Sequence, residues 1–188
     1  MKKILFSIAF TTVLASVYSF APTTKTTTVA TYTVATDASK VEFTGSKKAG
    51  YHHGSFTLKS GSIDVENGKL ANGKFVIDLS TVKADAGEKL EGHLKSPDFF
   101  DVAKFAEATY EITNVNYTSA STAEINGTLS LKGISLPVKF IANIRNIDDK
   151  KFFAQANFSI DRTLWGINYG VGMVSNDVQV AVFLFANK

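Results

Sequence analysis

The chain of 188 residues contains no cysteine, only three histidines and three prolines, and a single tryptophan. Without cysteine there is no disulfide, no thiol nucleophile and no cysteine-linked lipid anchor, so the hydrophobic core must supply the stability. The charge is nearly balanced, with 20 basic and 17 acidic residues and no run of five like charges. A nucleic-acid-binding surface is therefore not expected.

A short apolar stretch opens the chain. Lys2 and Lys3 precede the apolar residues 4–15, and small residues follow as far as Ala21. A basic start, an apolar centre and a small-residue end are typical of a secretory signal peptide, whereas a membrane-spanning helix needs a longer apolar run. We therefore expect a signal peptide over residues 1–21, with an uncleaved anchor as the alternative, and a periplasmic or secreted mature protein.

The rest of the chain predicts one domain. Residues 22–30 are rich in threonine and have no apolar period, which is typical of a flexible tail. Residues 31–188 are enough for a single domain with a sizeable core.

Within that domain, apolar side chains recur at every second residue, as expected for strands with one buried face. The alternating sets are 75–79, 138–144, 152–160 and 178–184. Turn sequences rich in glycine, asparagine and aspartate separate or interrupt these stretches, at 66–68, 71–73, 126–127, 132–133 and 148–150. About eight strands with short connections predict antiparallel pairing in a closed barrel or a sandwich.

One segment departs from this period. Asp85 is a candidate helix cap with Glu88 three residues later, and Leu90 and Leu94 share one face of the helix that would follow. Pro97 would end it, because proline cannot donate the required backbone hydrogen bond. The pattern predicts a short helical insert with a buried apolar face.

Of the fifteen phenylalanines, twelve lie outside the predicted signal peptide and make the predicted interior strongly aromatic. An eight-stranded barrel is just wide enough to be filled by its own side chains or to hold one small ligand. The residues alone leave both outcomes open, and filling by side chains is the simpler interpretation.

Several motifs occur in a fixed order. A His-x-Gly-x-Phe strand is followed by Gly-Lys-Phe, by His-Leu-Lys-Ser-x-Asp-Phe-Phe-Asp-Val, by Gly-x-Leu-x-x-Lys-Gly and by Asp-Arg-x-x-Trp-x-x-x-Tyr-Gly. The segments that contain them are 50–56, 73–78, 90–102, 126–134 and 161–170. Together they resemble the YceI-like polyisoprenoid-binding family of exported bacterial proteins over residues 32–186. Two positions depart from the family, since Phe43 replaces an expected tryptophan and Ala106 an expected proline.

The resemblance implies an all-β fold with a short helical insert, namely an elongated, lipocalin-like, eight-stranded antiparallel barrel. It also implies an apolar interior that takes an isoprenoid chain, such as the tail of a polyprenyl lipid or a quinone. Combined with strand parity, it predicts an aromatic lining of the cavity or its mouth by Phe43, Phe56, Phe75, Phe99, Phe100, Phe140, Phe158, Trp165 and Tyr169. Polar side chains that would hold a head group are His52, His53, His93, Asp161 and Arg162.

Some of these residues have simpler interpretations. Asp161 and Arg162 are expected to form an ion pair at the barrel end, and Trp165 and Tyr169 to plug that end as readily as to line the cavity. His52 and His53 are neighbours on a strand, so their side chains should point to opposite faces and cannot share one metal ion without a bulge.

The sequence therefore predicts an exported binding protein that holds or carries an apolar lipid, without cofactor, catalytic residues or metal. Such a carrier is compatible with transient membrane contact, and the outward Phe153 and Phe183 are consistent with a homodimer. The main alternative is a stress-related, adhesive or chaperone-like surface protein without bound lipid. A metal site joining His93 to one neighbouring histidine, or an enzyme, is the weaker alternative, since no Gly-x-Ser-x-Gly motif is present.

Overall fold

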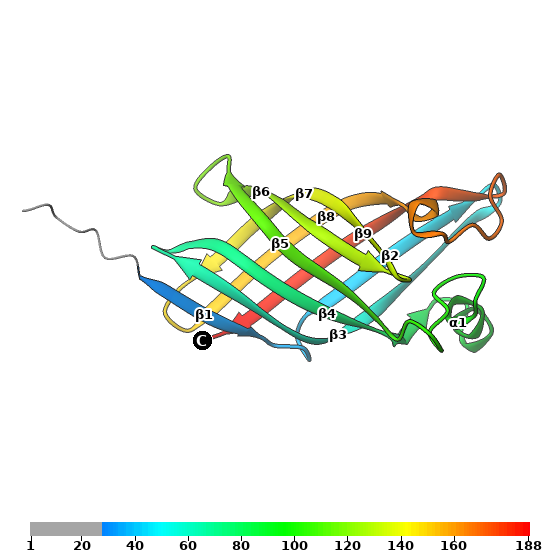
Figure 1. Ribbon diagram of the computed structural model, residues 1–188, viewed down its shortest axis with the longest axis horizontal. Coiled ribbons are helices and arrows are strands. Elements are labelled where there is room, and N and C mark those ends of the chain that lie inside the picture. The colour runs from blue at the N-terminus through cyan, green and yellow to red at the C-terminus, as the bar shows by residue number, and fades with distance from the viewer. Residues whose placement is uncertain (1–27) are drawn as a thin grey trace, which may run out of the picture.

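The computed structural model describes residues 28–188, so the predicted signal peptide and most of the predicted tail lie outside the described residues. The described chain forms antiparallel strands with one short α-helix and one 3-10 helix (Figure 1). In chain order these elements are β1 (Val29–Val34), β2 (Lys40–Lys47), β3 (Gly50–Glu66), β4 (Lys69–Ala84), α1 (Glu88–Lys95), β5 (Glu107–Tyr117), β6 (Thr122–Leu131), β7 (Ile134–Ile147), β8 (Lys151–Asp161), η1 (Arg162–Trp165) and β9 (Val174–Asn187). No helix within residues 28–188 is long and apolar enough to cross a membrane.

The sheet closes on itself. Its strand order is β1-β3-β2-β9-β8-β7-β6-β5-β4, and β4 pairs again with β3. β1 and β2 follow one another at the same position between β3 and β9, since β1 pairs with the 62–66 end of β3 and β2 with its 50–56 end. The barrel therefore has eight strand positions, and the predicted fold class is confirmed.

β1 begins at Val29, which pairs with Glu66 of β3. The last two residues of the predicted flexible tail are thus part of the barrel. The prediction was wrong here because the stretch is short and threonine-rich, whereas the pairing edge of β3 lies far away in sequence.

The barrel is elongated (Figure 1). β3 has 17 residues and β4 has 16, and at about 3.3 Å per residue β3 spans roughly 56 Å. Tilt of the strands shortens this to a barrel roughly 40 Å tall. We call one end the β1 end, with the turns 67–68, 118–121 and 148–150. The other is the α1 end, with α1, η1, the turns 48–49 and 132–133, and the loop 166–173.

Three of the predicted turns occur where expected, at 67–68, 132–133 and 148–150. The predicted turns at 71–73 and 126–127 are wrong, because these residues lie inside β4 and β6. Their glycines serve a different purpose, since each leaves room for a neighbouring side chain in the barrel interior. A Cβ atom on Gly127 would lie 2.5 Å from the hydroxyl oxygen of Tyr110, and one on Gly73 would lie 3.1 Å from the ring of Phe75.

The helical insert occurs as predicted but starts differently. α1 begins after Gly87, which makes no side-chain capping bond, so the predicted cap by Asp85 is wrong. Asp85 instead accepts hydrogen bonds from β3, as described below. Leu94 is buried, Leu90 packs beside it, and the helix ends at Lys95, ahead of Pro97.

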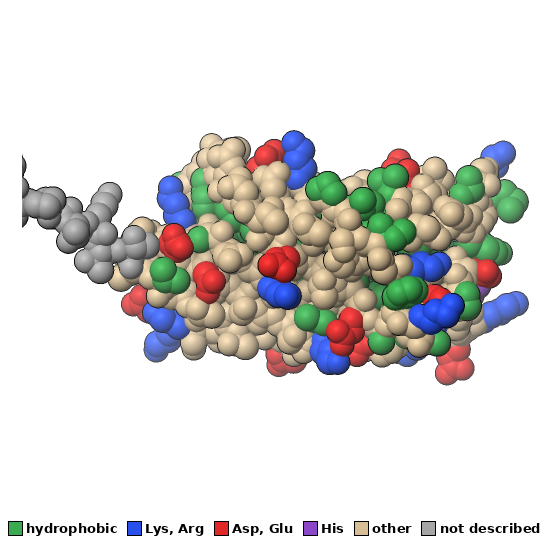
Figure 2. Space-filling view, in the orientation of Figure 1, with side chains coloured by type: hydrophobic (Ala, Val, Ile, Leu, Met, Phe, Trp, Pro, Cys, Tyr) green, Lys and Arg blue, Asp and Glu red, His purple; other side chains and the backbone are tan. Residues whose placement is uncertain are grey.

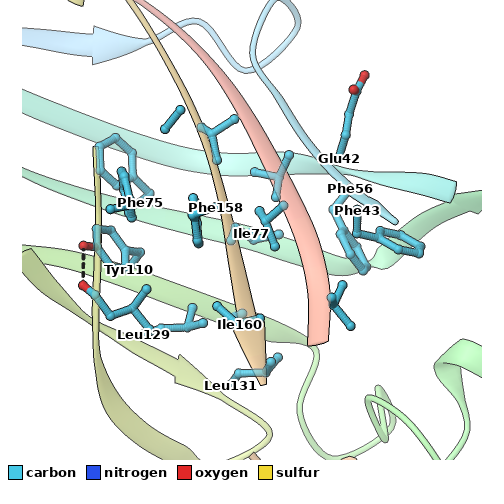
Figure 3. Close-up of a pocket in the computed structure, with 18 of the residues that line it drawn as sticks. Glu42, Phe43, Phe56, Phe75, Ile77, Tyr110, Leu129, Leu131, Phe158 and Ile160 are labelled. Carbon is cyan, nitrogen blue, oxygen red and sulfur yellow. Dashed lines mark hydrogen bonds between the residues drawn. The ribbon is translucent and has the colours of Figure 1, made fainter. Parts of the chain in front are cut away.

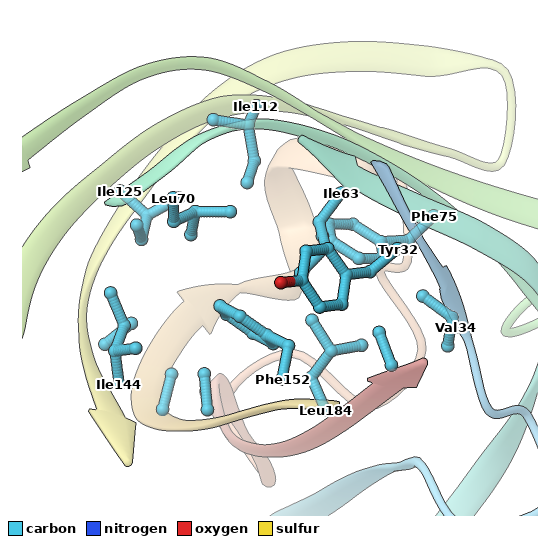
Figure 4. Packing of buried hydrophobic residues seen from close by; sticks show 14 of the residues in the cluster. Tyr32, Val34, Ile63, Leu70, Phe75, Ile112, Ile125, Ile144, Phe152 and Leu184 are labelled. Carbon is cyan, nitrogen blue, oxygen red and sulfur yellow. The ribbon is translucent and has the colours of Figure 1, made fainter. Parts of the chain in front are cut away.

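The β1 end is packed solid (Figure 4). Tyr32, Ile63 and Phe152 are almost completely buried there, and the Tyr32 hydroxyl donates a 2.6 Å hydrogen bond to the carbonyl of Asp148. Figure 4 shows Phe152 and Leu184 next to Tyr32, on strands that neighbour one another at this end. Large side chains therefore stop the interior at this end.

We expect Gly127→Ala to lower the free energy of unfolding by about 1–3 kcal/mol, because the new methyl group collides with Tyr110 and with the carbonyl of Glu111. Gly92→Ala is the matched control. Gly92 is exposed on α1 with nothing within 4 Å of an added Cβ, so alanine should stabilise by about 0.5–1 kcal/mol. Urea unfolding of both variants measures the difference. If both variants changed the free energy of unfolding by the same amount, the packing role of Gly127 would be contradicted.

Candidate functional site: an apolar barrel cavity

A cavity of about 240 Å³ runs through the barrel interior (Figure 3). Its volume lies just below the range of about 300–1,000 Å³ usual for small-molecule sites. The lining reaches from Phe152 near the β1 end to Phe43 and Phe100 at the α1 end. The cavity is therefore long and narrow, which fits a chain better than a compact molecule.

The structure brings most of the predicted aromatic side chains together around this cavity. Of the nine predicted side chains, seven line the cavity, namely Phe43, Phe56, Phe75, Phe99, Phe100, Phe140 and Phe158. The Phe56 ring packs against Phe43 and edge-on against Phe100, each at 5.3 Å between centroids. Phe99 and Phe100 follow α1, so the helical insert contributes directly to the wall of the cavity.

Trp165 and Tyr169 are not part of the lining. Trp165, the last residue of η1, is 2% exposed, donates from Nε1 to the carbonyl of Leu129 at 3.2 Å, and packs into the core. Tyr169 is 45% exposed and lies outside, against His93 and Phe99. Trp165 is thus a plug of the α1 end, while Tyr169 lies on its rim.

Several lining positions were not singled out from the sequence. The inward face of β9 supplies Val178, Val180 and Val182, and β5 supplies Tyr110. Strand parity places the three valines on one face of β9, but the predicted lining consists of aromatic residues alone. Burial raises the pKa of Tyr110 far above its usual range, so it remains a neutral phenol that donates to the carbonyl of Val138 at 3.0 Å.

Polar side chains scarcely reach this interior. Glu42, Gln155 and Arg162 are the charged or amide residues in contact with the cavity, and Figure 3 shows the Glu42 carboxylate directed away from Phe43 and Phe56. The walls offer few hydrogen bonds to a ligand. Selection in this cavity must therefore depend on shape and apolar contact.

The barrel wall is incomplete on one side at the α1 end. The pairing of β7 with β8 runs from Ile147–Phe152 to Ala142–Ala156, and within the described chain no further pairs follow. Beyond this point the rings of Phe140 and Phe158 stack at 4.3 Å between centroids. Pro137 lies in the part of β7 that pairs with β6 but not with β8, and proline, which has no backbone donor, is tolerated at such edges. Side chains, rather than backbone hydrogen bonds, close the wall here.

η1 and the loop after it cover this split. Trp165 bonds to Leu129 of β6, and Ile134 at the start of β7 approaches Gly166. Gly166 adopts a left-handed conformation with φ 69°, which turns the chain back toward the barrel. The cover is thus an irregular segment without pairing to β7, and it adjoins the cavity through Ile167.

Arg162 holds this cover in place. Its side chain is buried, with the residue 4% exposed, and donates to the carbonyls of Ile167 at 2.5 Å, Ser175 at 2.9 Å and Val174 at 3.3 Å. Burial lowers the pKa of its guanidinium, and the nearby Asp161 opposes this shift. The planar group joins both ends of the 166–175 segment while also touching the cavity.

The predicted ion pair between Asp161 and Arg162 is not formed. Asp161 accepts from the amide and the hydroxyl of Thr163 and caps η1, and these bonds lower the pKa of its carboxyl. Within residues 28–188, Arg162 donates to three backbone carbonyls and to no carboxylate. The two side chains diverge because Asp161 ends a strand and Arg162 starts the helical turn that folds inward.

His52 and His53 meet at one carboxylate, against the expectation of opposite faces. Their Nδ1 atoms lie 3.0 and 3.2 Å from the two oxygens of Asp85. Asp85 lies just beyond the end of β4, beside the backbone of β3, and can therefore reach both neighbours. Desolvation on its own would raise the pKa of Asp85, but the hydrogen bonds from His52 and from the His53 amide outweigh it and lower the pKa.

The third histidine is separate from this cluster in its partners. His93 on α1 has Nε2 3.0 Å from the carboxylate of Asp98, and its ring packs edge-on against Phe99 and Tyr169. None of the three histidines belongs to the cavity lining. Within residues 28–188 no group of three or more histidine, cysteine or acidic residues is arranged to hold a metal ion.

Comparison with known proteins identifies the family. The YceI-like domain matches residues 32–186, and the chain belongs to the YceI-like family. A UPF0312 protein of Pseudomonas fluorescens (strain SBW25) is 34% identical over 93 residues, which are 49% of this chain and 48% of the relative. A UPF0312 protein of Azotobacter vinelandii is 35% identical over 91 residues, 48% of this chain and 47% of the relative. The chain thus spans about half the length of the curated relatives it matches.

Solved structures share the fold at lower identity. BcnA of Burkholderia cenocepacia superposes with a TM-score of 0.70 at 19% identity, covering 81% of this chain and 99% of BcnA. A polyisoprenoid binding domain from Saccharophagus degradans, implicated in plant cell wall breakdown, superposes with a TM-score of 0.68 at 20% identity, covering 83% of this chain and 97% of that domain.

We expect Arg162→Met to lower the free energy of unfolding by about 2–4 kcal/mol, because the change leaves buried carbonyls without donors. Arg162→Lys should recover only part of the loss, since an ammonium lacks the planar fork that spans three carbonyls. Lys139→Met, on the exposed outer wall, is the control and should stay within about 0.5 kcal/mol of the wild type. Urea unfolding compares the three, and an Arg162→Met variant as stable as the control would refute the clamp.

Proposed function

We propose that the protein binds an isoprenoid chain, or a similar apolar lipid chain, inside its barrel. The observation that supports this most directly is a long, narrow cavity whose walls are almost entirely hydrocarbon. A binding-protein fold, rather than a known enzyme family, is common to the YceI-like chains, and a polyisoprenoid binding domain shares it.

Simple energetics are consistent with a ligand held by its tail alone. Each methylene group that leaves water for the cavity contributes about 0.8 kcal/mol. A chain of several isoprene units would nominally exceed the observed affinity ceiling of roughly 18–21 kcal/mol, so chain ordering and imperfect contacts must offset part of the gain. Length and width of the chain are then the features that such a site selects.

Of the five polar residues predicted at the mouth, Arg162 is the one that contacts the cavity. We propose that it is the nearest candidate for a head-group contact. Its three carbonyl partners leave two of the five guanidinium N–H groups without a partner among the described residues. His52, His53 and His93 lie outside the cavity lining, and Asp161 is occupied by Thr163.

A second surface feature bears on the homodimer hypothesis. Phe153 and Phe185 stack on the outer wall at 4.3 Å between centroids, and Phe183 lies on the same face of β9. Outward aromatic side chains on neighbouring strands form the kind of flat apolar face that a second copy could cover. The same patch would serve the alternative adhesive or chaperone-like function.

We expect lipid to co-purify with the wild type and to be reduced in amount in Gly45→Leu. Gly45 contacts the cavity, and an added Cβ meets nothing within 4 Å, so leucine would extend into empty space. Displacing only two methylene groups of a ligand costs about 1.6 kcal/mol, which corresponds to more than tenfold in affinity. Mass spectrometry of an organic extract, from protein purified without detergent, measures the lipid per protein chain.

Gly92→Leu is the matched control, because it adds the same side chain on the exposed face of α1. It should carry the wild-type amount of lipid. If folded wild-type protein yields an empty extract, side chains fill the barrel and the proposal fails. Unchanged lipid in a folded Gly45→Leu variant would move the site away from the cavity.

We also propose export to the periplasm or the outside of the cell, on the strength of residues 1–21 alone. The expected result is a mature chain whose N-terminus lies after Ser19 or Ala21, recovered from the periplasmic or secreted fraction. Mass spectrometry of the intact protein gives the cleavage site. Replacing Ile4 and Leu5 with aspartate should block export, because it interrupts the apolar stretch. An unprocessed chain in the cytoplasm of the wild type would exclude this localisation.

A further inference from the structure

The cover of the α1 end is unusual in composition. Residues 163–176 contain no charged side chain. Yet this segment exposes large apolar groups to solvent: Leu164 is 58% exposed, Val171 55% and Met173 70%. Apolar side chains this exposed, in a segment held by the buried Arg162 clamp, contribute little to the core.

Further segments also expose apolar side chains at the α1 end. Nine large apolar side chains are exposed in the described chain. Six of them belong to the α1 end: Tyr51, Ile134, Leu164, Tyr169, Val171 and Met173. The contacts between these segments are direct. Ile134 approaches Gly166, Val174 pairs with Lys47 beside the 48–49 turn, and Tyr169 packs on His93 of α1.

Basic side chains lie among the exposed apolar groups of the α1 end. Lys47, Lys48 and Lys132 lie at or beside the turns of the α1 end. Some carboxylates there have partners, since Asp85 contacts two histidines, Asp98 contacts His93, and Asp101 contacts Lys104, whereas Glu88 and Asp177 are exposed. Figure 2 shows green apolar side chains at this end, among blue basic and red acidic ones.

The exposed apolar side chains of the α1 end also lie next to the β7–β8 split, a candidate opening of the cavity. The β7–β8 split lies beneath η1, and Ile167 and Val174, on either side of the exposed loop, both line the cavity. A ligand leaving through the split would emerge among the exposed apolar side chains. The exposed surface and the apolar interior are thus continuous.

From these observations we propose that the α1 end is a membrane-docking surface, which places the loop 166–173 in the headgroup region of a lipid bilayer. The proposal rests on the proposed lipid-binding function and extends it to the place of ligand exchange. Apolar tips without charge enter a bilayer interface at low cost, and flanking lysines are attracted to anionic lipids. Separate protruding turns suit a soft lipid surface better than the flat, self-complementary face that a dimer requires.

The test is flotation of the protein, as its host processes it, with two kinds of vesicle: phosphatidylcholine alone, and phosphatidylcholine mixed with phosphatidylglycerol. We expect wild-type protein to bind the mixed vesicles, more weakly at high salt. Val171→Asn/Met173→Asn should bind at least about tenfold more weakly, because two apolar side chains no longer enter the interface. Neither residue lines the cavity, so the double variant should keep its co-purified lipid.

Val29→Asn/Ile141→Asn is the matched control, because both residues are exposed and apolar but lie away from the α1 end. It should bind vesicles within about twofold of the wild type, given the small effect of surface changes remote from an interface. A tryptophan reporter shows which end of the barrel meets the vesicles. The fluorescence emission of Met173→Trp should shift to shorter wavelength when vesicles are added, and that of Ile141→Trp should not.

Absence of vesicle binding by the wild type would overturn the docking surface, as would an equal loss in the control. Loss of self-association in Val171→Asn/Met173→Asn, measured by sedimentation without any effect on vesicles, would assign the surface to a second copy instead. The lipid extract separates the two proposals. An empty wild-type extract contradicts lipid binding in the cavity, whereas a full extract without vesicle binding contradicts docking alone.

Discussion

The structure depends on one closed ladder of backbone hydrogen bonds. Because β3 pairs with both β2 and β4, the sheet has no free edge along most of its length, and every second side chain must face the interior. Closure fixes the inward set on all eight strand positions at once. A one-residue slip of any strand would place its apolar set in water, so the aromatic interior and the register stabilise each other.

That constraint fixes the wall but leaves the filling of the barrel to local choices. At the β1 end, large side chains such as Tyr32, Ile63 and Phe152 pack together and close the interior. Toward the α1 end, Gly45 takes up little space and leaves room in the cavity. The difference in side-chain size along a uniform barrel, rather than any change of fold, determines where a ligand has room.

The sequence predicted the wall better than its ends. Period two assigned Phe75, Phe140 and Phe158 to the interior, because strand parity needs only local information. The Asn-Gly pair wrongly placed Gly127 in a turn. A glycine that faces a large ring inside a strand cannot be told from a turn glycine by its sequence.

The residues at the α1 end depend on contacts between distant segments. Asp85 resembles a helix cap until the backbone of His53 is brought beside it. Arg162 resembles half of an ion pair until η1 turns it toward the carbonyls of the following loop. The β7–β8 split has no local signal apart from Pro137, because loss of pairing depends on where both strands diverge.

The proposed ligand class gives the incomplete wall a physical purpose. An isoprenoid chain moving from the cavity into water would lose about 0.8 kcal/mol for every methylene group exposed, and exchange through water would be correspondingly slow. A lipid bilayer is as apolar as the cavity, so transfer at its surface involves little net hydrophobic cost. Efficient exchange then requires an outlet that opens without breaking backbone pairing. Between β7 and β8 the wall is closed by the Phe140–Phe158 stack and by an irregular cover, so an opening there would separate side chains without breaking β7–β8 backbone pairs.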